Sequence, residues 1–233
     1  MSQASTVYTL LRRAILDCEF EPGSPLVVSS LKARFGFGWT PLREALPRLE
    51  TEQLVRFEAN KGYRVAPVSL AGLKDLQTAR AALETTLLER SIERGADDWE
   101  AGIVAAHHLL AQSPAPPAGL IVPESLIWEG RHRAFHTALL SAADAPWLEH
   151  LSLQTADQLH RHHRFMLYGP DVEEKLNGPS GKALRATFDR SLGLSHHTAL
   201  MEATIDRDLP LARDLLQDHI GFSMAVYEGL GPR

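Results

Sequence analysis

Four of the eleven histidines are spaced so that they could bind a metal ion together. His132 and His136 are four residues apart on a predicted helix, so their rings lie one above the other on the same face. Phe135 and its apolar neighbours share that region of the helix, which indicates that the face points inward. His197 and His219 each belong to the apolar stripe of a further predicted helix.

Buried imidazoles need hydrogen-bond partners or a shared metal, because an unsatisfied buried polar group is costly. A single inward histidine is usually an ordinary core residue, so the metal prediction depends on all four meeting. Imidazole suits zinc, nickel, copper or iron, and facing helices of a bundle often supply such ligands. We therefore predict a divalent transition metal, zinc or nickel by preference. The other seven histidines are expected at the surface or around these four.

The elements that must position these histidines are helices. From Pro67 onward, apolar residues recur at helical spacing and no strand pattern is found. Helices are predicted from Ser69, which can cap the first one, to near Gly95, and from Asp97 to about residue 113. Four more are predicted over residues 124–142, 146–167, 181–205 and 209–228, with a loop between Gly169 and Pro179. Six helices without strands predict an all-α antiparallel bundle.

The part of the chain before Pro67 has a different pattern. An apolar stripe predicts a first helix that ends near Glu21. Ser29 or Ser30 is expected to cap a short second helix. Thr40 followed by Pro41 predicts the start of a third helix, because threonine can cap the free N–H groups and proline suits the first helical position.

A β-hairpin is predicted after the third helix. Val55 and Phe57 alternate before the turn Asn60-Lys61-Gly62, and Tyr63 and Val65 alternate after it. Three helices followed by a two-stranded wing form a winged helix-turn-helix. In that arrangement the third helix can enter the major groove of DNA, and the tip of the hairpin can reach the backbone or minor groove.

Composition and charge agree with a globular, nucleic-acid-binding chain. Of the 233 residues, 44% are apolar and 23% charged, which excludes the disordered and collagen-like classes. Residues 1–66 hold nine basic and seven acidic side chains, whereas the rest of the chain is acidic. The single cysteine, Cys18, cannot form an internal disulfide, and no apolar run is long enough to cross a membrane. Without a signal-peptide profile at the start, a cytoplasmic location is expected.

The sequence resembles the GntR family of DNA-binding regulators in its head and the FCD-type effector domain of the FadR subfamily in its body. The head resemblance rests on Pro22-Gly23-Ser24-Pro25-Leu26, Thr40-Pro41-Leu42-Arg43-Glu44-Ala45-Leu46 and Gly62-Tyr63-Arg64-Val65. The body resemblance rests on Arg80 and Glu84, on Trp128-Glu129 with His132-Arg133-Ala134-Phe135-His136, and on the stretches around His197 and His219. The segment Trp128-Glu129-Gly130-Arg131-His132 most resembles the sequences of the branch that regulates glutarate and 4-aminobutyrate catabolism.

The resemblance implies a winged helix-turn-helix domain over residues 1–67 and an all-α domain for metal binding, effector binding and dimerisation over residues 68–233. Trp39 stands where many members have an arginine, and Gln53 replaces a usual glycine before the wing. The first departure removes the usual base contact, so Arg43 is expected to carry more of the DNA binding. The predicted DNA-binding residues are Arg43, Thr40, Trp39, Arg34, Lys61 and Gly62.

FCD domains commonly bind a divalent metal through an aspartate and three histidines. His132 stands at the position of the aspartate, so the resemblance implies a site made of histidine alone. A small organic carboxylate is the expected effector, with Arg80, Arg161 and Glu84 as its candidate site, because a guanidinium pairs bidentately with a carboxylate. A buried ion pair between Arg80 and Glu84 is the alternative.

Two function classes follow from these features. The favoured one is a transcriptional regulator, a repressor and homodimer, that binds a pseudo-palindromic operator and responds to a small carboxylate. The rival is a metal-dependent hydrolase that carries the head as a structural appendage, because three ligands and an open position also suit catalysis. The sequence has no His-Glu-x-x-His, Gly-x-Ser-x-Gly or phosphate-loop motif, which favours the regulator.

Overall fold

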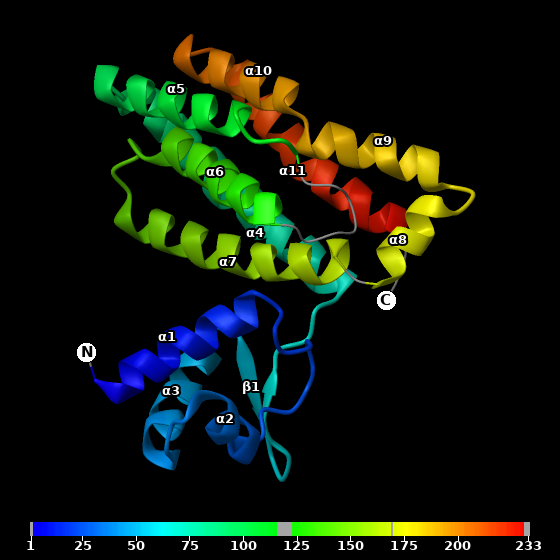
Figure 1. Ribbon diagram of the computed structural model, residues 1–233. Helices are drawn as coiled ribbons and strands as arrows, with labels where there is room; N and C mark the ends of the chain where they lie inside the picture. Colours follow the sequence, from blue (N-terminus) through cyan, green and yellow to red (C-terminus); the bar gives the residue numbers. More distant parts are fainter. Residues whose placement is uncertain (1, 116–122, 169, 231–233) are drawn as a thin grey trace. The chain divides into compact units, whose positions relative to one another are not determined.

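The computed structural model describes residues 2–115, 123–168 and 170–230 (Figure 1). Within them the chain is mainly helical, as predicted. It divides into two compact units: Met1–Leu73 with Ala156–Phe165, and Lys74–Thr155 with Met166–Arg233. No helix in the described ranges combines the length and the apolar character that a bilayer crossing requires.

The first unit contains a winged helix-turn-helix, as predicted. Its elements are α1 (Gln3–Leu16), α2 (Val28–Phe35), α3 (Trp39–Thr51), β1 (Val55–Glu58) and β2 (Gly62–Val65). The two strands pair antiparallel in the register Val55↔Val65 and Phe57↔Tyr63. Asn60 and Gly62 adopt positive φ angles of 65° and 78°, which let the chain reverse in the short turn between the strands.

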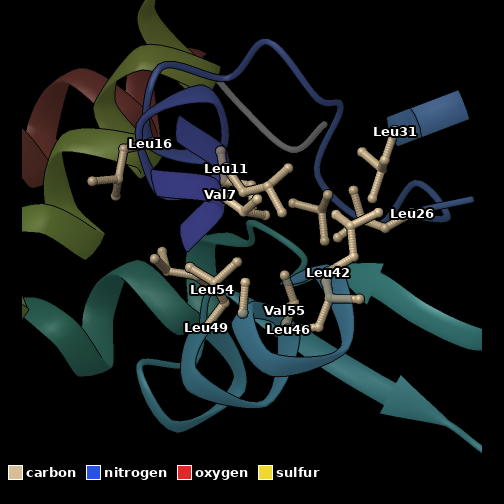
Figure 2. Packing of buried hydrophobic residues seen from close by; sticks show 13 residues of the cluster. Val7, Leu11, Leu16, Leu26, Leu31, Leu42, Leu46, Leu49, Leu54 and Val55 are labelled. Carbon is tan, nitrogen blue, oxygen red and sulfur yellow. The ribbon is translucent and has the colours of Figure 1, made fainter. Parts of the chain in front are cut away.

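One apolar core holds the head together. Its thirteen buried residues come from the three helices, the wing and the segments between them (Figure 2). Leu11 of α1 and Leu42 and Leu49 of α3 are fully buried, because the three- and four-residue spacing directs them to one side of each helix. Each such side chain contributes about 1.5–3 kcal/mol through burial, so the core fixes how α3 is presented.

The helix ends in the head differ from the prediction. α1 ends at Leu16 rather than near Glu21, because Cys18 adopts a left-handed backbone (φ 56°) that cannot continue the helix. α2 follows Val27 and has no side-chain cap, so neither Ser29 nor Ser30 caps it.

α3 also starts earlier than predicted. Gly38 is its N-cap with an extended backbone (ψ 176°), and the helix begins at Trp39. Thr40 is therefore already helical and is not the N-cap that the sequence predicted. Thr40 and Pro41 still lie in the first turn of α3, a position that proline tolerates.

The second unit is built from helices. They are α4 (Leu70–Arg94), α5 (Asp97–Ala111), α6 (Pro123–Leu140), α7 (Pro146–Leu167), α8 (Pro170–Asn177), α9 (Gly181–Leu192), α10 (Leu194–Ile205) and α11 (Leu209–Leu230); α4 and α7 also extend into the first unit. At the start of α4, the backbone N–H of Gly72 donates to the Ser69 hydroxyl (3.0 Å), which bears out Ser69 as the predicted cap.

Eight helices lie in the described part of the body, where six were predicted. The single helix expected over residues 181–205 is interrupted at Gly193, whose extended backbone (ψ 140°) ends α9 and starts α10. The loop expected before Pro179 contains α8 instead, because Val172 and Leu176 lie four residues apart and are both buried. Gly169, the other end of that predicted loop, lies outside the described residues.

α6 contributes to the apolar core of the body. α6 packs against α5, which also packs against α10, and α10 packs against α11. The indole N–H of Trp99 on α5 donates to the Ala138 carbonyl on α6 (2.9 Å). Phe135 and Leu139 of α6 are 0% and 1% exposed, which places their face of the helix in the interior. The helices that carry the four histidines are therefore held by one apolar cluster.

Candidate functional site

The four predicted ligand histidines converge in the second unit. α6 supplies His132 and His136, α10 supplies His197, and α11 supplies His219. One ring nitrogen from each lies within 4.8 Å of the corresponding atom of the other three. These four residues are called the histidine cluster below. Three helices thus bring together side chains that are up to 87 residues apart in the sequence.

The rings of the histidine cluster contact one another closely. Ring centroids are 4.6 Å apart for His132 and His136, 4.6 Å for His136 and His219, and 4.8 Å for His197 and His219. Trp128, one turn before His132, stacks on its ring at 4.6 Å with an interplanar angle of 16°. His197 and His219 are 1% and 5% exposed, whereas His132 is only half-buried. His132 is therefore the most exposed member of the histidine cluster.

Two buried ring nitrogens of the histidine cluster lack hydrogen-bond partners among the described residues. His197 Nδ1 donates to the Gly193 carbonyl (2.8 Å), which leaves Nε2 as an acceptor with a lone pair. Among the described residues, neither His197 Nε2 nor His219 Nδ1 has a hydrogen-bond partner, although both are buried. His136 Nε2 and His132 Nε2 lie 3.2 Å apart. Buried nitrogens without partners are costly, and a cation shared by the four rings would satisfy them.

Burial keeps the deep histidines neutral. It lowers the pKa of His197 to about 4, against the hydrogen bond to Gly193, which raises it. Burial also lowers the pKa of His136 and of His219 well below the ordinary value, and the neighbouring imidazoles and Arg80 lower both further. Neutral imidazole is the form that binds metal. The donor set therefore fits a divalent transition metal, since imidazole favours zinc, nickel or copper over magnesium or calcium.

Arg80 and Glu84 form the buried ion pair that was the alternative to effector binding. Arg80 Nε donates to Glu84 Oε2 (3.0 Å) one turn along α4, and the two residues are 8% and 6% exposed. The charge of Arg80 acts on three histidines of the cluster, so the guanidinium belongs to the same region. The pairing with Glu84 holds the guanidinium in place without removing its other N–H donors.

Arg161, the other candidate effector-binding arginine, makes its hydrogen bonds within the first unit. Arg161 belongs to the first unit, and the histidines belong to the second. Its guanidinium donates to the Ala66 carbonyl (2.7 Å) and to Gln158 Oε1 (3.0 Å), and the residue is 2% exposed. It was assigned because it is an arginine on an inward helix face, and the part of α7 that carries it, Ala156–Phe165, is grouped with the first unit.

The head presents the predicted DNA-binding residues at its surface. Trp39, Thr40 and Arg43 lie in the first turns of α3 and are all exposed, Trp39 by 63%. Lys61 is exposed in the wing turn, next to the first residue of β2, Gly62. Arg43 is thus an exposed cation near the start of α3, and Lys61 is an exposed cation in the wing turn.

Arg34 is held by other residues of the head. It forms an ion pair with Glu19, and its guanidinium lies over the rings of Phe20 (4.8 Å) and Phe35 (5.2 Å). The pair is about half exposed, so the charge stays near the surface of α2. A phosphate contact by Arg34 would have to compete with the carboxylate of Glu19.

Trp128 and His162 make contacts that sequence reasoning missed. The stacking of Trp128 on His132 follows from their four-residue spacing and was accessible in the sequence. His196 stacks on His219 (5.6 Å, 12°), so it lies beside the cluster, which is one of the two locations expected for it. His162, expected at the surface or near the cluster, is 4% exposed in the first unit, with Nδ1 2.8 Å from the Gln158 carbonyl.

Comparison with known proteins matches both parts of the chain. Residues 3–65 match the gntR family of bacterial regulatory proteins, and residues 75–222 match the FCD domain. The HTH-type transcriptional repressor GlaR of Escherichia coli strain K12 is 34% identical over 213 residues, which cover 91% of this chain and 90% of the relative. The HTH-type transcriptional regulator BphR of Paraburkholderia xenovorans strain LB400 is 29% identical over 99% of this chain and 87% of its own length.

Solved structures share the fold. A putative GntR transcriptional regulator from Rhodococcus sp. RHA1 superposes with a TM-score of 0.68 at 21% identity, covering 98% of this chain and 99% of its own. The E. coli protein McbR/YncC superposes with a TM-score of 0.66 at 20% identity, covering 98% of both chains.

These relatives are transcription regulators and not enzymes, so the hydrolase alternative has no support. The chain therefore belongs to the gntR family of bacterial transcriptional regulators and is a DNA-binding protein whose body is an FCD domain.

Proposed function

We propose that the protein is a repressor whose affinity for its operator is controlled by a small organic carboxylate bound at a metal ion in the histidine cluster. The observation that carries this proposal is the meeting of four imidazoles from α6, α10 and α11, two of them with buried ring nitrogens that lack partners among the described residues. The relative that is 34% identical is named a repressor, which supports repression here.

His132, His136, His197 and His219 would hold the ion, zinc or nickel by preference. When bound, such an ion supplies a positive centre with which an anionic ligand can complete the coordination. Four neutral imidazoles do not offset the charge of a divalent cation, whereas the aspartate usual in this domain would offset part of it. We therefore expect this site to depend more strongly on an anionic effector.

Arg80 would provide the second contact to the effector. Its guanidinium is buried, it acts electrostatically on the cluster, and Glu84 occupies only its Nε side. A carboxylate accepts two parallel N–H bonds from a guanidinium, so one acid group could bind there. A dicarboxylate suits two positive centres, because each of its carboxylates can bind one of them.

In the head, Arg43, Thr40 and Trp39 on α3 would enter the major groove, with Arg34 and the wing residues Lys61 and Gly62 near the backbone. We propose residues 1–67 as the DNA-binding domain and residues 68–233 as the domain for metal, effector and dimerisation. A homodimer would present two heads to a pseudo-palindromic operator. The effector would act by binding one arrangement of the dimer more tightly than the other, in the cytoplasm.

A thermal-shift screen tests the sensing part. Dicarboxylates and amino acids are added to the protein with and without a chelator, because a ligand that binds the native state raises the melting temperature. We expect one carboxylate class to raise it only when metal is present. If no carboxylate raises the melting temperature of the metal-loaded protein, the proposed carboxylate site at the histidine cluster is excluded.

A mobility-shift titration tests the DNA-binding part. The probe is the DNA upstream of the protein's own gene, with an unrelated duplex of equal length as control. We expect retention of the upstream fragment at concentrations that leave the control unbound, and release when the effector found in the screen is added. Equal retention of both fragments would contradict specific operator binding.

A further inference from the structure

One face of the wing carries a carboxylate among three cations. Arg56 and Arg64 lie directly opposite each other in the hairpin register, and cross-strand partners share a face of the sheet. Glu58 is two residues after Arg56 on β1, so its side chain is on that same face. Lys61 follows in the turn. We call these four residues the wing charge cluster.

Glu58 contacts all three cations of the wing charge cluster. Its Oε1 lies 2.9 Å from Arg56 Nη2 and 3.9 Å from Arg64 Nε, and its Oε2 lies 3.5 Å from Lys61 Nζ. The side chains of Glu58 and Arg64 are 26% and 28% exposed, whereas those of Arg56 and Lys61 are 50% and 69% exposed. Glu58 and Arg64 are therefore the more enclosed members, and Arg56 and Lys61 lie toward solvent.

The carboxylate of Glu58 offsets the repulsion between Arg56 and Arg64 in the hairpin. Two like charges directly opposite each other in a β-ladder are destabilising, and Arg56 and Arg64 form such a pair. Glu58 compensates both guanidiniums in the free protein. A phosphate oxygen has the same charge sign and the same hydrogen-bonding pattern toward arginine and lysine, so it can replace the carboxylate.

We propose that Glu58 competes with DNA phosphate for Arg56, Lys61 and Arg64, and so limits how tightly the wing binds DNA of any sequence. The inference rests on the proposed placement of the wing against DNA. When the head docks, a phosphate takes over the cations and Glu58 is displaced from them or repelled. Glu58 thereby lowers the affinity that carries no sequence information, while base contacts from α3 are unaffected.

Removing the carboxylate has a defined consequence. In Glu58→Gln the three cations are available to phosphate without competition. Since the three ion pairs of Glu58 no longer have to be broken, we expect binding to a duplex of random sequence to tighten roughly 3- to 150-fold. The variant removes one negative charge beside the bound phosphate, so the dependence of log K on log salt should steepen by up to about 0.9 per protomer. Operator binding should tighten by about the same factor as random-duplex binding, because the wing contacts phosphate in both complexes.

The experiment uses the full-length protein and a fluorescently labelled 30-base-pair duplex of random sequence, titrated at several salt concentrations by anisotropy. Glu21→Gln is the matched control, because it removes the same charge from an exposed carboxylate of the head outside the wing. Lys61→Gln is measured in both the wild-type and the Glu58→Gln background. We expect it to cost more affinity when Glu58 is absent, since Lys61 then contributes fully.

Unchanged or weaker binding by a folded Glu58→Gln protein would overturn the proposal, and weaker binding would mean that Glu58 holds the cations in place for DNA. An equal gain in Glu21→Gln would reduce the effect to net charge and overturn it as well. If Glu58→Gln does not fold, Arg56→Gln/Glu58→Gln removes the like-charge repulsion and should bind more tightly than Arg56→Gln alone. Wild-type protein that binds neither random nor upstream DNA would instead contradict the proposed function.

Discussion

Replacing His219 by leucine should raise the stability of the metal-free protein and abolish its stabilisation by metal. The ring of His219 is 5% exposed, and its Nδ1 has no hydrogen-bond partner among the described residues. An unsatisfied buried polar group costs about 1–3 kcal/mol, and leucine of similar size removes that cost. If His219 were an ordinary structural residue, the leucine variant would be less stable than the wild type without metal, because the replacement would lose contacts and gain nothing.

The expected free energies predict that the order of the two melting temperatures reverses between chelator and zinc. In chelator, a gain of about 1 kcal/mol raises the melting temperature of a chain of this length by about 2–4 °C. With zinc at a hundred times its dissociation constant, the wild-type protein gains about 2.7 kcal/mol, and the variant gains almost none. The variant should therefore melt above wild type in chelator and several degrees below it in zinc.

Differential scanning fluorimetry in chelator and in zinc measures both shifts, and elemental analysis of the purified proteins gives their metal content. His150→Leu is the control, since His150 is an exposed histidine of α7 outside the histidine cluster. It should leave the zinc response as it is in the wild type. The reasoning is refuted if His219→Leu melts below wild type in chelator, or if zinc stabilises both proteins equally.

Three further predictions concern the head, the core and pH. Arg43→Ala should weaken operator binding at least roughly tenfold, since a specific base contact is worth about 1–3 kcal/mol, and should leave the melting temperature unchanged; equal affinity in a mobility-shift titration would contradict the assignment of α3. Phe135→Ala, at a residue that is 0% exposed, should cost about 3–5 kcal/mol in urea unfolding and reduce metal content, because Phe135 contacts the rings of His136 and His197. Burial lowers the pKa of His162 from 6.5 to about 4. The stability that the neutral ring gives the folded protein is therefore complete above pH 6.5 and is lost as the pH falls toward 4. Between pH 7 and pH 5 this should cost about 2 kcal/mol of the free energy of unfolding, and the loss should be smaller in His162→Gln.

Local patterns made the fold of the head predictable. The alternation of Val55 and Phe57 before a Gly62-containing turn specified the hairpin, because residues two apart on a strand share a face. The helix ends were less predictable. Cys18 ends α1 through its backbone conformation, and Gly38 rather than Thr40 caps α3, since a helix starts where the preceding backbone is extended and several nearby residues could meet that condition.

The candidate site was partly predictable for the same reason. The pairing of His132 and His136 follows from helical spacing alone, and so does the contact of Trp128 with His132. Amphipathic stripes placed His197 and His219 on inward faces but did not determine that the faces meet. Arg161 has an equally inward position and is held by the Ala66 carbonyl instead, because inward burial does not specify which partner a side chain will contact.

The sequence by itself determined which residues lie on which side of each helix and strand, because that depends on a periodicity of two or 3.6 residues within a few turns of chain. Only the tertiary structure decided that α6, α10 and α11 direct four imidazoles to one point and that Gly193 separates α9 from α10 to place His197 there. Those outcomes depend on contacts between segments far apart in the chain, where the packing of whole apolar faces outweighs the preference of any single residue.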